Sequence, residues 1–306
     1  MKPQRPFFGF SFALLATTMW GTLPIAAQKV LSVMDAQTLV WVRFIVAAIG
    51  LFLILGFTKK LPKLAACKAR DWQLLGLAVI ALAINFFLFS YALNFISPTT
   101  NQVLWQLAPF TMMLCGVLIF KEKFQLHQKI GLLLLIIGLV AFFNNRFGEI
   151  FQFGIYAFGL LVSAGAAIIW VIYAIAQKMM LAKFSSQQIL LVIYIGCGIV
   201  IAPFATPTEI GEFNGFIWGC FIYCCLNTII GYGAYAEALN HWDATKVSVV
   251  TTLTPIVTMV FSSIGHWAFP DTFASPDMNL LSYIGAFIVV SGTILSAVGH
   301  KLVKRK

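Results

Sequence analysis

The stretch Tyr91-Ala92-Leu93-Asn94, followed by Pro109, recurs as Glu237-Ala238-Leu239-Asn240, followed by Pro255. Asn94 and Asn240 are 146 residues apart (240 − 94), and the two prolines have the same spacing (255 − 109). Further residues match between the halves: Thr99 with Thr245, Gly131 with Gly285, Gly138 with Gly292, and Trp20 with Trp170. Matching residues at a nearly constant spacing indicate that one ancestral unit has been duplicated and fused.

The composition indicates an integral membrane protein. Hydrophobic residues make up 60% of the 306 residues and charged residues only 10%, and the mean hydropathy is +0.92. A chain with so little polar surface is not expected to dissolve in water. Backbone groups that face lipid have no water to bind, so the predicted fold class is all-α. Ten transmembrane helices are predicted, at about 7–30, 36–57, 72–95, 98–120, 128–144, 153–177, 185–205, 213–240, 245–267 and 280–299.

The distribution of Lys and Arg predicts the orientation of these helices. If the chain crosses the membrane ten times, nearly all of the 20 Lys and Arg residues fall on one side, and Lys29 and Arg146 fall on the other. Segments rich in Lys and Arg stay in the cytoplasm, so both termini are predicted to be cytoplasmic. The net charge of +10 then reflects this topology and the anionic lipid headgroups of the bilayer. No nucleic-acid partner is predicted.

Each half contains an odd number of predicted spans, so the second half is expected to lie upside down in the membrane relative to the first. Inverted repeats of this kind enclose a site near the bilayer midplane, and rocking one repeat against the other opens the site to each side in turn. Pro109 and Pro255 fall inside spans at matching positions. Each frees a backbone carbonyl one turn earlier, so both are predicted hinges.

Several motifs resemble those of the EamA-type branch of the drug/metabolite transporter superfamily. They are Trp20-Gly21 in the first span, Arg43-Phe44 in the second, and the series Pro109, Lys121-Glu122-Lys123, Gly131 and Gly138. The resemblance covers about residues 9–143 and 156–298. It implies one EamA-like five-helix repeat at 7–147, a second at 150–300, and a secondary transporter in the bacterial cytoplasmic (inner) membrane. Glu122 has Ala268 as its counterpart in the second half, so Glu122 is expected to be a loop or helix-end residue.

Polar and aromatic side chains inside the spans are candidates for binding a substrate, because such groups are costly in lipid unless they face a neighbour or a watery path. The fourth span places Asn101 and Trp105 one turn apart, and Gln102 and Gln106 likewise. The predicted substrate-binding residues are Trp20, Asn101, Gln102, Trp105, Gln106, Trp170, Tyr173, Tyr235, Ser248, Thr251 and Thr252. An alternative is that the polar groups bond to one another between helices and that the rings are ordinary core.

Two charged residues lie within spans away from the clusters of Lys and Arg. Glu237 is a candidate for proton coupling, although it is near the cytoplasmic end of the eighth span. Arg43 would suit a substrate carboxylate, but a structural role near the end of the second span is the preferred interpretation. The histidines lie in loops or at span ends, and the six cysteines form no disulfide framework. No catalytic residue, metal or cofactor is predicted, and an enzyme is not expected.

The predicted function is a secondary transporter that exports a small organic metabolite such as an amino acid. Both the substrate class and the direction are implied by the resemblance. Alternatives are a carrier of drugs or other metabolites, a carrier of phosphorylated sugars or nucleotide sugars, and a membrane receptor without transport. Phosphorylated cargo would require several Arg or Lys residues around a central site, which the predicted spans lack. The expected partners are the substrate and the lipid bilayer, and a homodimer is compatible with the sequence.

Overall fold

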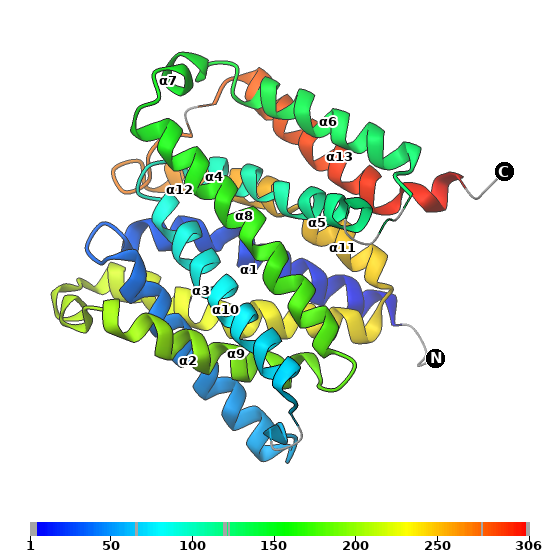
Figure 1. The fold of residues 1–306 in the computed structure, drawn as a ribbon. Coiled ribbons are helices and arrows are strands. Elements are labelled where there is room, and N and C mark those ends of the chain that lie inside the picture. Colours follow the sequence, from blue (N-terminus) through cyan, green and yellow to red (C-terminus); the bar gives the residue numbers. More distant parts are fainter. Residues whose placement is uncertain (1–4, 65–66, 119–120, 122, 277, 304–306) are drawn as a thin grey trace. The chain divides into compact units, whose positions relative to one another are not determined.

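A computed structural model of the protein describes residues 5–64, 67–118, 121, 123–276 and 278–303, and over this part of the chain it contains helices and no strand (Figure 1). The α-helices are α1 (Pro6–Val30), α2 (Ala36–Phe57), α3 (Ala69–Ala92), α4 (Pro98–Trp105), α5 (Leu107–Leu118), α6 (Leu126–Phe142), α7 (Phe147–Phe151), α8 (Ile155–Met180), α9 (Ser186–Ile201), α10 (Gly215–His241), α11 (Ala244–Thr252), α12 (Thr254–Ala268) and α13 (Leu280–Val303). Two short 3₁₀ helices, η2 (Ala202–Phe204) and η3 (Pro207–Glu212), follow α9.

Eight segments of the described chain are long and apolar enough to cross a membrane. They are α1, α2, α3, α8, α9 with η2, α10, α11 together with α12, and α13. The other two predicted spans differ in form. The fourth is interrupted at Gln106, between α4 and α5, and the fifth is α6, an apolar helix of 17 residues. The chain is therefore a multi-pass α-helical membrane protein, while the count of ten spans stays a prediction.

Helix starts follow the capping chemistry of the sequence. The Asp35 side chain accepts a hydrogen bond from the Thr38 amide at the start of α2, with an N···O distance of 2.6 Å. Before α4, the Ser97 hydroxyl accepts from the Thr100 amide at 3.2 Å, and Pro98 occupies the first helical turn, where no amide is needed. These caps satisfy donors that have no partner inside the helix.

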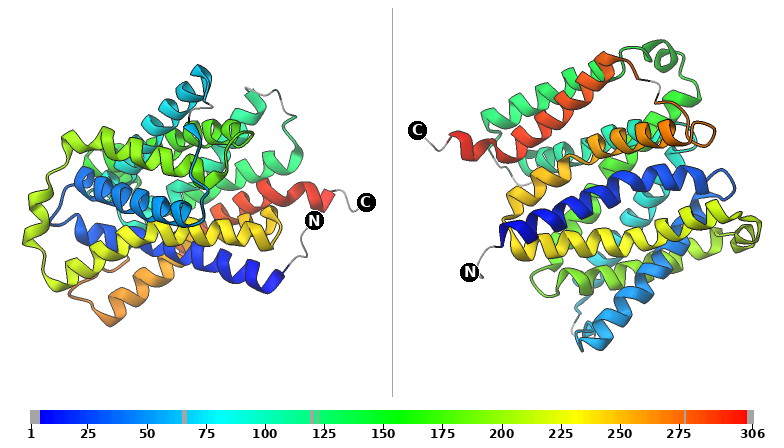
Figure 2. Two further views of the ribbon diagram at one scale, coloured as in Figure 1. Left: turned by 90° about the horizontal axis from the view of Figure 1, so that it is seen from below. Right: turned by 180° about the vertical axis from the view of Figure 1, so that it is seen from behind.

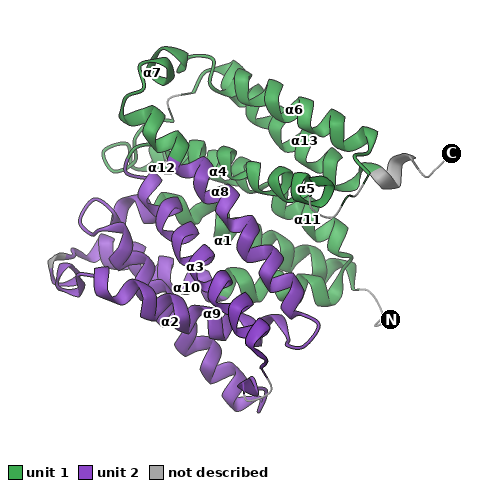
Figure 3. Cartoon of the chain, viewed as in Figure 1, with its two compact units in different colours: residues 1–25, 95–161, 230–306 green, residues 26–94, 162–229 purple. Residues whose placement is uncertain are grey.

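The chain forms two compact units (Figure 3). Unit 1 contains residues 1–25, 95–161 and 230–306, and unit 2 contains residues 26–94 and 162–229. Each unit combines segments from both halves of the sequence, so the compact units do not follow the predicted repeats at 7–147 and 150–300. Three helices, α1, α8 and α10, begin in one unit and end in the other.

In unit 1, α6 and α13 lie side by side along their lengths (Figure 2). Glycines make this approach close: a Cβ atom on Gly131 would lie 2.6 Å from the carbonyl oxygen of Gly292, and one on Gly138 would lie 2.8 Å from that of Gly285. The contacts run in opposite directions along the chain, so the two helices are antiparallel. Within the same unit α13 also contacts α5, α11 and α12, and α4 contacts α12.

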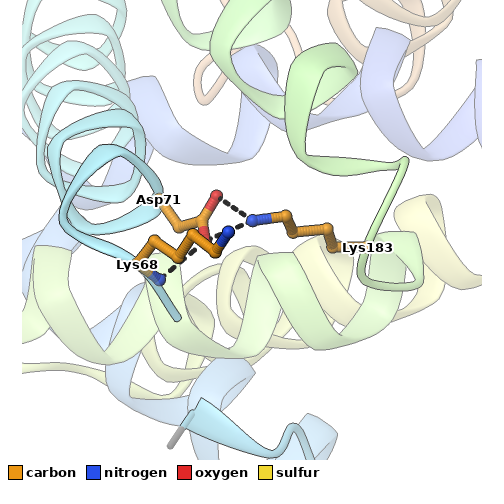
Figure 4. A network of polar contacts seen from close by, with 3 residues as sticks. All are labelled: Lys68, Asp71 and Lys183. Carbon is orange, nitrogen blue, oxygen red and sulfur yellow. Dashed lines mark hydrogen bonds and ion pairs between the residues drawn. The ribbon is translucent and has the colours of Figure 1, made fainter. Parts of the chain in front are cut away.

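Unit 2 is built around α2, α3 and α9, which pack on one another. Phe44 of α2 is fully buried and its ring lies 4.7 Å from the ring of Phe86 and 5.8 Å from that of Tyr194. At the start of α3, Asp71 accepts hydrogen bonds from the Lys183 ammonium, at 2.8 and 2.6 Å, and from the Lys68 amide at 2.8 Å (Figure 4). This network ties the loop after α8 to the first turn of α3.

Candidate functional site

Most of the predicted substrate-binding residues belong to a single compact unit. Unit 1 contains nine of the eleven residues predicted to bind substrate, namely Trp20, Asn101, Gln102, Trp105, Gln106, Tyr235, Ser248, Thr251 and Thr252. The remaining residues, Trp170 and Tyr173, lie on α8 in unit 2, where their rings are 6.2 Å apart and Tyr173 is buried. The candidate site is therefore described from unit 1.

The two predicted hinge prolines accompany breaks in their helices. Pro109 lies three residues after Gln106, the residue that separates α4 from α5, and Pro255 lies two residues after Leu253, which separates α11 from α12. Proline lacks an amide hydrogen, so the carbonyl four residues earlier loses its helical donor. For Pro255 that carbonyl belongs to Thr251, and the hydroxyl of Thr254 donates to it at 2.5 Å.

The side chain of Gln106 connects these two breaks. Its amide nitrogen donates to the backbone carbonyl of Thr252, the last residue of α11, with an N···O distance of 3.3 Å. Only 4% of the surface of Gln106 is exposed. The amide therefore contributes to holding the ends of two interrupted helices together, which is the interhelical bonding that the sequence allowed as an alternative to substrate binding.

Gln102 is engaged in a similar way. Its amide nitrogen donates to the backbone carbonyl of Trp20 in α1, at 2.9 Å. The next carbonyl in α1, that of Gly21, accepts a hydrogen bond from the hydroxyl of Thr258 at 2.7 Å. The Trp20 carbonyl lies one turn before Pro24 and the Gly21 carbonyl one turn before Ile25, so both are close to the proline inside α1.

Aromatic rings and hydroxyls surround the same part of unit 1. The Trp20 ring lies 5.4 Å from the ring of Tyr232 and also 5.4 Å from that of Tyr235. The Thr251 and Thr252 hydroxyls donate to the carbonyl of Ser248, at 3.1 and 2.8 Å. Trp105 is half-buried, whereas Asn101 has no exposed surface. The side chain of Trp105 is therefore less buried than that of Asn101.

The buried polar residues of unit 1, as far as the structure describes them, are uncharged amides and hydroxyls together with His127. Among the residues that the structure describes, no Asp, Glu, Lys or Arg of unit 1 is buried, whereas unit 2 buries Arg43 and Asp71. Such an environment can orient a substrate through amide, hydroxyl and indole groups. Within the described residues it offers no buried ammonium or guanidinium to a phosphate, and no buried carboxylate to a cation.

Arg43 and Glu237 have different surroundings. Arg43 is buried in unit 2, where its Nε and Nη2 atoms each lie 3.3 Å from the hydroxyl of Thr228 and its guanidinium lies 4.9 Å from the centre of the Phe86 ring. Glu237 lies near the end of α10, with its side chain 48% exposed and its carboxylate 3.7 Å from Nε2 of His241. Arg43 belongs to unit 2, and the contacts of Glu237 are with Asn240 and His241 of its own helix.

The described part of the chain contains no group of three or more His, Cys, Asp or Glu residues that could hold a metal ion. All six cysteines are free thiols. Glu122, which the sequence assigns to a loop or helix end, lies outside the described residues. The structure adds Thr258 to the candidate site, a residue that was not predicted as part of it, and the ring of Tyr232 lies beside that of Trp20. A threonine three residues after Pro255 is a polar group inside a span, and that signal was available in the sequence.

Comparison with known proteins identifies the family. The model of the EamA-like transporter family matches residues 7–144 and again residues 157–298. The chain belongs to this family. It is 54% identical over 303 residues to an uncharacterized transporter of Haemophilus influenzae, with 99% of both chains covered. It is 44% identical over 301 residues to the uncharacterized inner membrane transporter YhbE of Escherichia coli, with 98% of this chain and 94% of YhbE covered.

Two weaker similarities cover nearly the whole chain. The similarity to an Escherichia coli protein named "Probable amino-acid metabolite efflux pump" is 22% identity over 302 residues, with 94% of each chain covered. The crystal structure of another protein shares the fold, with a TM-score of 0.65 at 16% identity over 98% of this chain and all of the other. This EamA protein is thus a multi-pass membrane transporter of the bacterial inner membrane.

Proposed function

We propose that this EamA protein is a secondary transporter that exports a small zwitterionic metabolite, an amino acid or a close relative, by alternating access. The observation that carries the proposal is the neutral, polar and aromatic character of the candidate site in unit 1. A zwitterion has no net charge to compensate, so amides, hydroxyls and backbone carbonyls suffice to orient its two ends. An indole face adds a weak attraction for the ammonium group.

The name of the 22%-identical relative, an amino-acid metabolite efflux pump, supports both the substrate class and the direction. Phosphorylated cargo is disfavoured, because it would require Arg or Lys side chains at the site, and no described residue of those types is buried in unit 1. A carrier of drugs or other neutral metabolites is the second candidate. It is favoured by the accessibility of Trp105 and by the aromatic cluster of Trp20, Tyr232 and Tyr235.

The topology proposed for this function keeps ten spans, with α4 and α5 counted as one and α6 as another. The antiparallel contact of α6 with α13 supports an inverted repeat. Gly131 contacts Gly292, which is the counterpart of Gly138 in the repeat. Gly138 in turn contacts Gly285, which is the counterpart of Gly131. A reciprocal pattern of this kind is expected when a two-fold axis relates the partners. Alternating access is proposed to occur by movement of the two repeats.

Counterflow in proteoliposomes tests the proposal. The purified protein is reconstituted with an internal mixture of amino acids, and labelled amino acids are added outside with and without a pH gradient. We expect saturable exchange of at least one amino acid. Absence of exchange for every amino acid, together with exchange of a neutral drug or metabolite, would overturn the assigned substrate class in favour of the second candidate.

Two variants connect the exchange to the candidate site. Trp105→Ala removes an accessible indole of that site and is expected to reduce exchange by at least about tenfold, the loss that about 1.4 kcal/mol of binding free energy produces. Leu133→Ala is the matched control. Leu133 lies on α6 with 56% of its surface exposed, so exchange should persist. Equal exchange by both variants would remove Trp105 from the site.

A further inference from the structure

Pro24 leaves one carbonyl of α1 without its helical hydrogen-bond donor, and α1 itself does not supply another. Pro24 has no amide hydrogen, so the carbonyl of Trp20 loses the donor that an ordinary helix would supply, and the proline ring pushes that carbonyl away from the helix axis. In a membrane such a carbonyl finds no water, and transmembrane prolines are tolerated only where neighbouring groups satisfy the freed backbone. The donor to Trp20 must therefore come from another helix.

That donor is the side chain of Gln102 on α4, whose Nε2 atom lies 2.9 Å from the Trp20 carbonyl oxygen. Gln102 has only 4% of its surface exposed. A second donor supports the adjoining position: the hydroxyl of Thr258 on α12 lies 2.7 Å from the carbonyl oxygen of Gly21 and 3.0 Å from that of Thr254 in its own helix. Two helices of unit 1 thus bind consecutive carbonyls of α1 just before its proline.

The approach of α12 to α1 depends on a glycine. A Cβ atom at Gly21 would lie 2.8 Å from the Val257 side chain and 3.1 Å from the Thr254 carbonyl oxygen. A larger residue would force the helices apart and lengthen the bond from Thr258. The absence of a side chain at Gly21 therefore allows the Thr258 hydroxyl to reach its acceptor.

This arrangement exists in only one half of the repeat. When Trp20 is aligned with Trp170, Pro24 corresponds to Ala174 and Gly21 to Val171. With the spacing of 146 residues that relates Pro109 to Pro255, Gln102 corresponds to Ser248 and Thr258 to Met112. The proline and the glycine are replaced, Met112 has no hydrogen-bond donor in its side chain, and Ser248 has a hydroxyl on a much shorter side chain than that of Gln102. The second half therefore lacks the complete set of groups, namely the proline that frees a carbonyl, the glycine that allows close approach, and the two donors that bind the carbonyls.

Pro24 lies close, along the chain, to the boundary between the two compact units. Unit 1 includes α1 as far as Ile25, and unit 2 begins at Ala26. The helix therefore leaves unit 1 one residue after Pro24. Sharp bends of helices occur mostly at proline, and the bonds from Gln102 and Thr258 hold the segment of α1 that precedes Pro24.

We propose that Pro24 is a one-sided hinge in α1 and that Gln102 and Thr258 are its positioning residues, which hold the carbonyls of Trp20 and Gly21 and thereby set the direction of the helix. In this proposal the side chain of Gln102 binds a backbone carbonyl of the transporter itself and does not bind the substrate. Only the transport measurement below rests on the proposed function, because the unfolding measurements require no substrate.

A double-mutant cycle on the purified full-length protein tests the proposal. Gln102→Leu removes the donor with little change of size, and we expect it to lower the melting temperature by about 3–8 °C, since a buried carbonyl is left unsatisfied. Pro24→Ala returns an amide donor to the carbonyl of Trp20. In the Pro24→Ala background the further effect of Gln102→Leu should shrink to less than about 1 °C. Equal shifts in both backgrounds would overturn the proposal.

Gln106→Leu is the matched control, because Gln106 is equally buried but donates to Thr252 and not to α1. Its shift should be the same in the native and the Pro24→Ala backgrounds. If Gln102→Leu alone fails to accumulate as folded protein, the Pro24→Ala/Gln102→Leu variant should be recovered folded, and failure to recover it would also count against the proposal.

Counterflow separates the positioning role from substrate binding. For Gln102→Leu we expect the maximal rate to fall severalfold while the KM of the substrate changes less than twofold. A substrate-binding residue would instead raise KM in both backgrounds. A large KM increase in Gln102→Leu that Pro24→Ala does not relieve would assign Gln102 to the substrate. If the protein transports none of the tested substrates, the melting temperatures of the double-mutant cycle still test whether Gln102 acts through the carbonyl that Pro24 frees.

Discussion

The side chain of Gln106 donates a hydrogen bond to the backbone carbonyl of Thr252, and these two residues are counterparts in the repeat. They are 146 residues apart, the spacing that also separates Asn94 from Asn240 and Pro109 from Pro255. In the proposed inverted repeat, a residue that contacts its own counterpart would lie near the two-fold axis that relates the two halves. Repeated positions therefore meet where both α4–α5 and α11–α12 are interrupted.

The glycines of α6 and α13 provide a direct test of this packing. Gly131→Ala would place a methyl group 2.6 Å from the carbonyl oxygen of Gly292, and the two backbones would have to separate. We expect the free energy of unfolding to fall by about 1–3 kcal/mol, measured by denaturation of the purified protein. Gly76→Ala is the control, because a Cβ atom at Gly76 meets nothing within 4 Å. A larger loss in Gly76→Ala would contradict the packing described here.

Arg43 is expected to stabilise unit 2 and not to bind substrate. Its guanidinium reaches Thr228 through two nitrogens and lies over the Phe86 ring, a combination that a lysine ammonium cannot reproduce. Arg43→Lys should therefore lower the free energy of unfolding by about 2 kcal/mol, and Thr228→Val by about 1 kcal/mol. Unfolding of each variant measures this loss. An unchanged stability with a strongly raised substrate KM would return Arg43 to the substrate site.

Glu237 is expected to be dispensable for proton coupling. Its carboxylate is 48% exposed and its partner, His241, lies one turn further along the same helix. An exposed pair of this kind contributes about 0–1 kcal/mol to stability. For Glu237→Gln we predict an almost unchanged melting temperature and an unchanged response of counterflow to a pH gradient. Loss of that response at normal expression would make Glu237 the coupling residue after all.

Cysteine labelling tests the predicted orientation of the chain. Cys67 lies between α2 and α3, in a segment assigned to the cytoplasm, and it is partly exposed, whereas Cys224 has no exposed surface. A membrane-impermeant maleimide should label Cys67 in inside-out vesicles and leave it unlabelled in intact cells, since thiol reaction requires access from water. Cys224 should react only after denaturation. Labelling of Cys67 from outside the cell would invert the topology.

Much of the fold was predictable because the relevant properties are local. The predicted spans at 7–30 and 36–57 agree with α1 (Pro6–Val30) and α2 (Ala36–Phe57), since a run of apolar residues in lipid has no alternative to a helix. The break in the predicted span 98–120 was also indicated by Pro109. Its location at Gln106 was not, because the sequence of a helix does not show how the turn before a proline will adjust.

The amino-acid sequence by itself determined that this is a repeated, all-helical membrane protein of the EamA type, because hydropathy, charge and the recurrence of residues depend only on order along the chain. The tertiary structure decided which groups the buried polar side chains bind. Gln102 and Gln106 are indistinguishable in the sequence from substrate ligands, and yet both amides donate to backbone carbonyls of other helices. The reason is physical: a carbonyl freed near a proline or a helix break must find a donor, and only the packing of helices distant in sequence determines which side chain supplies it.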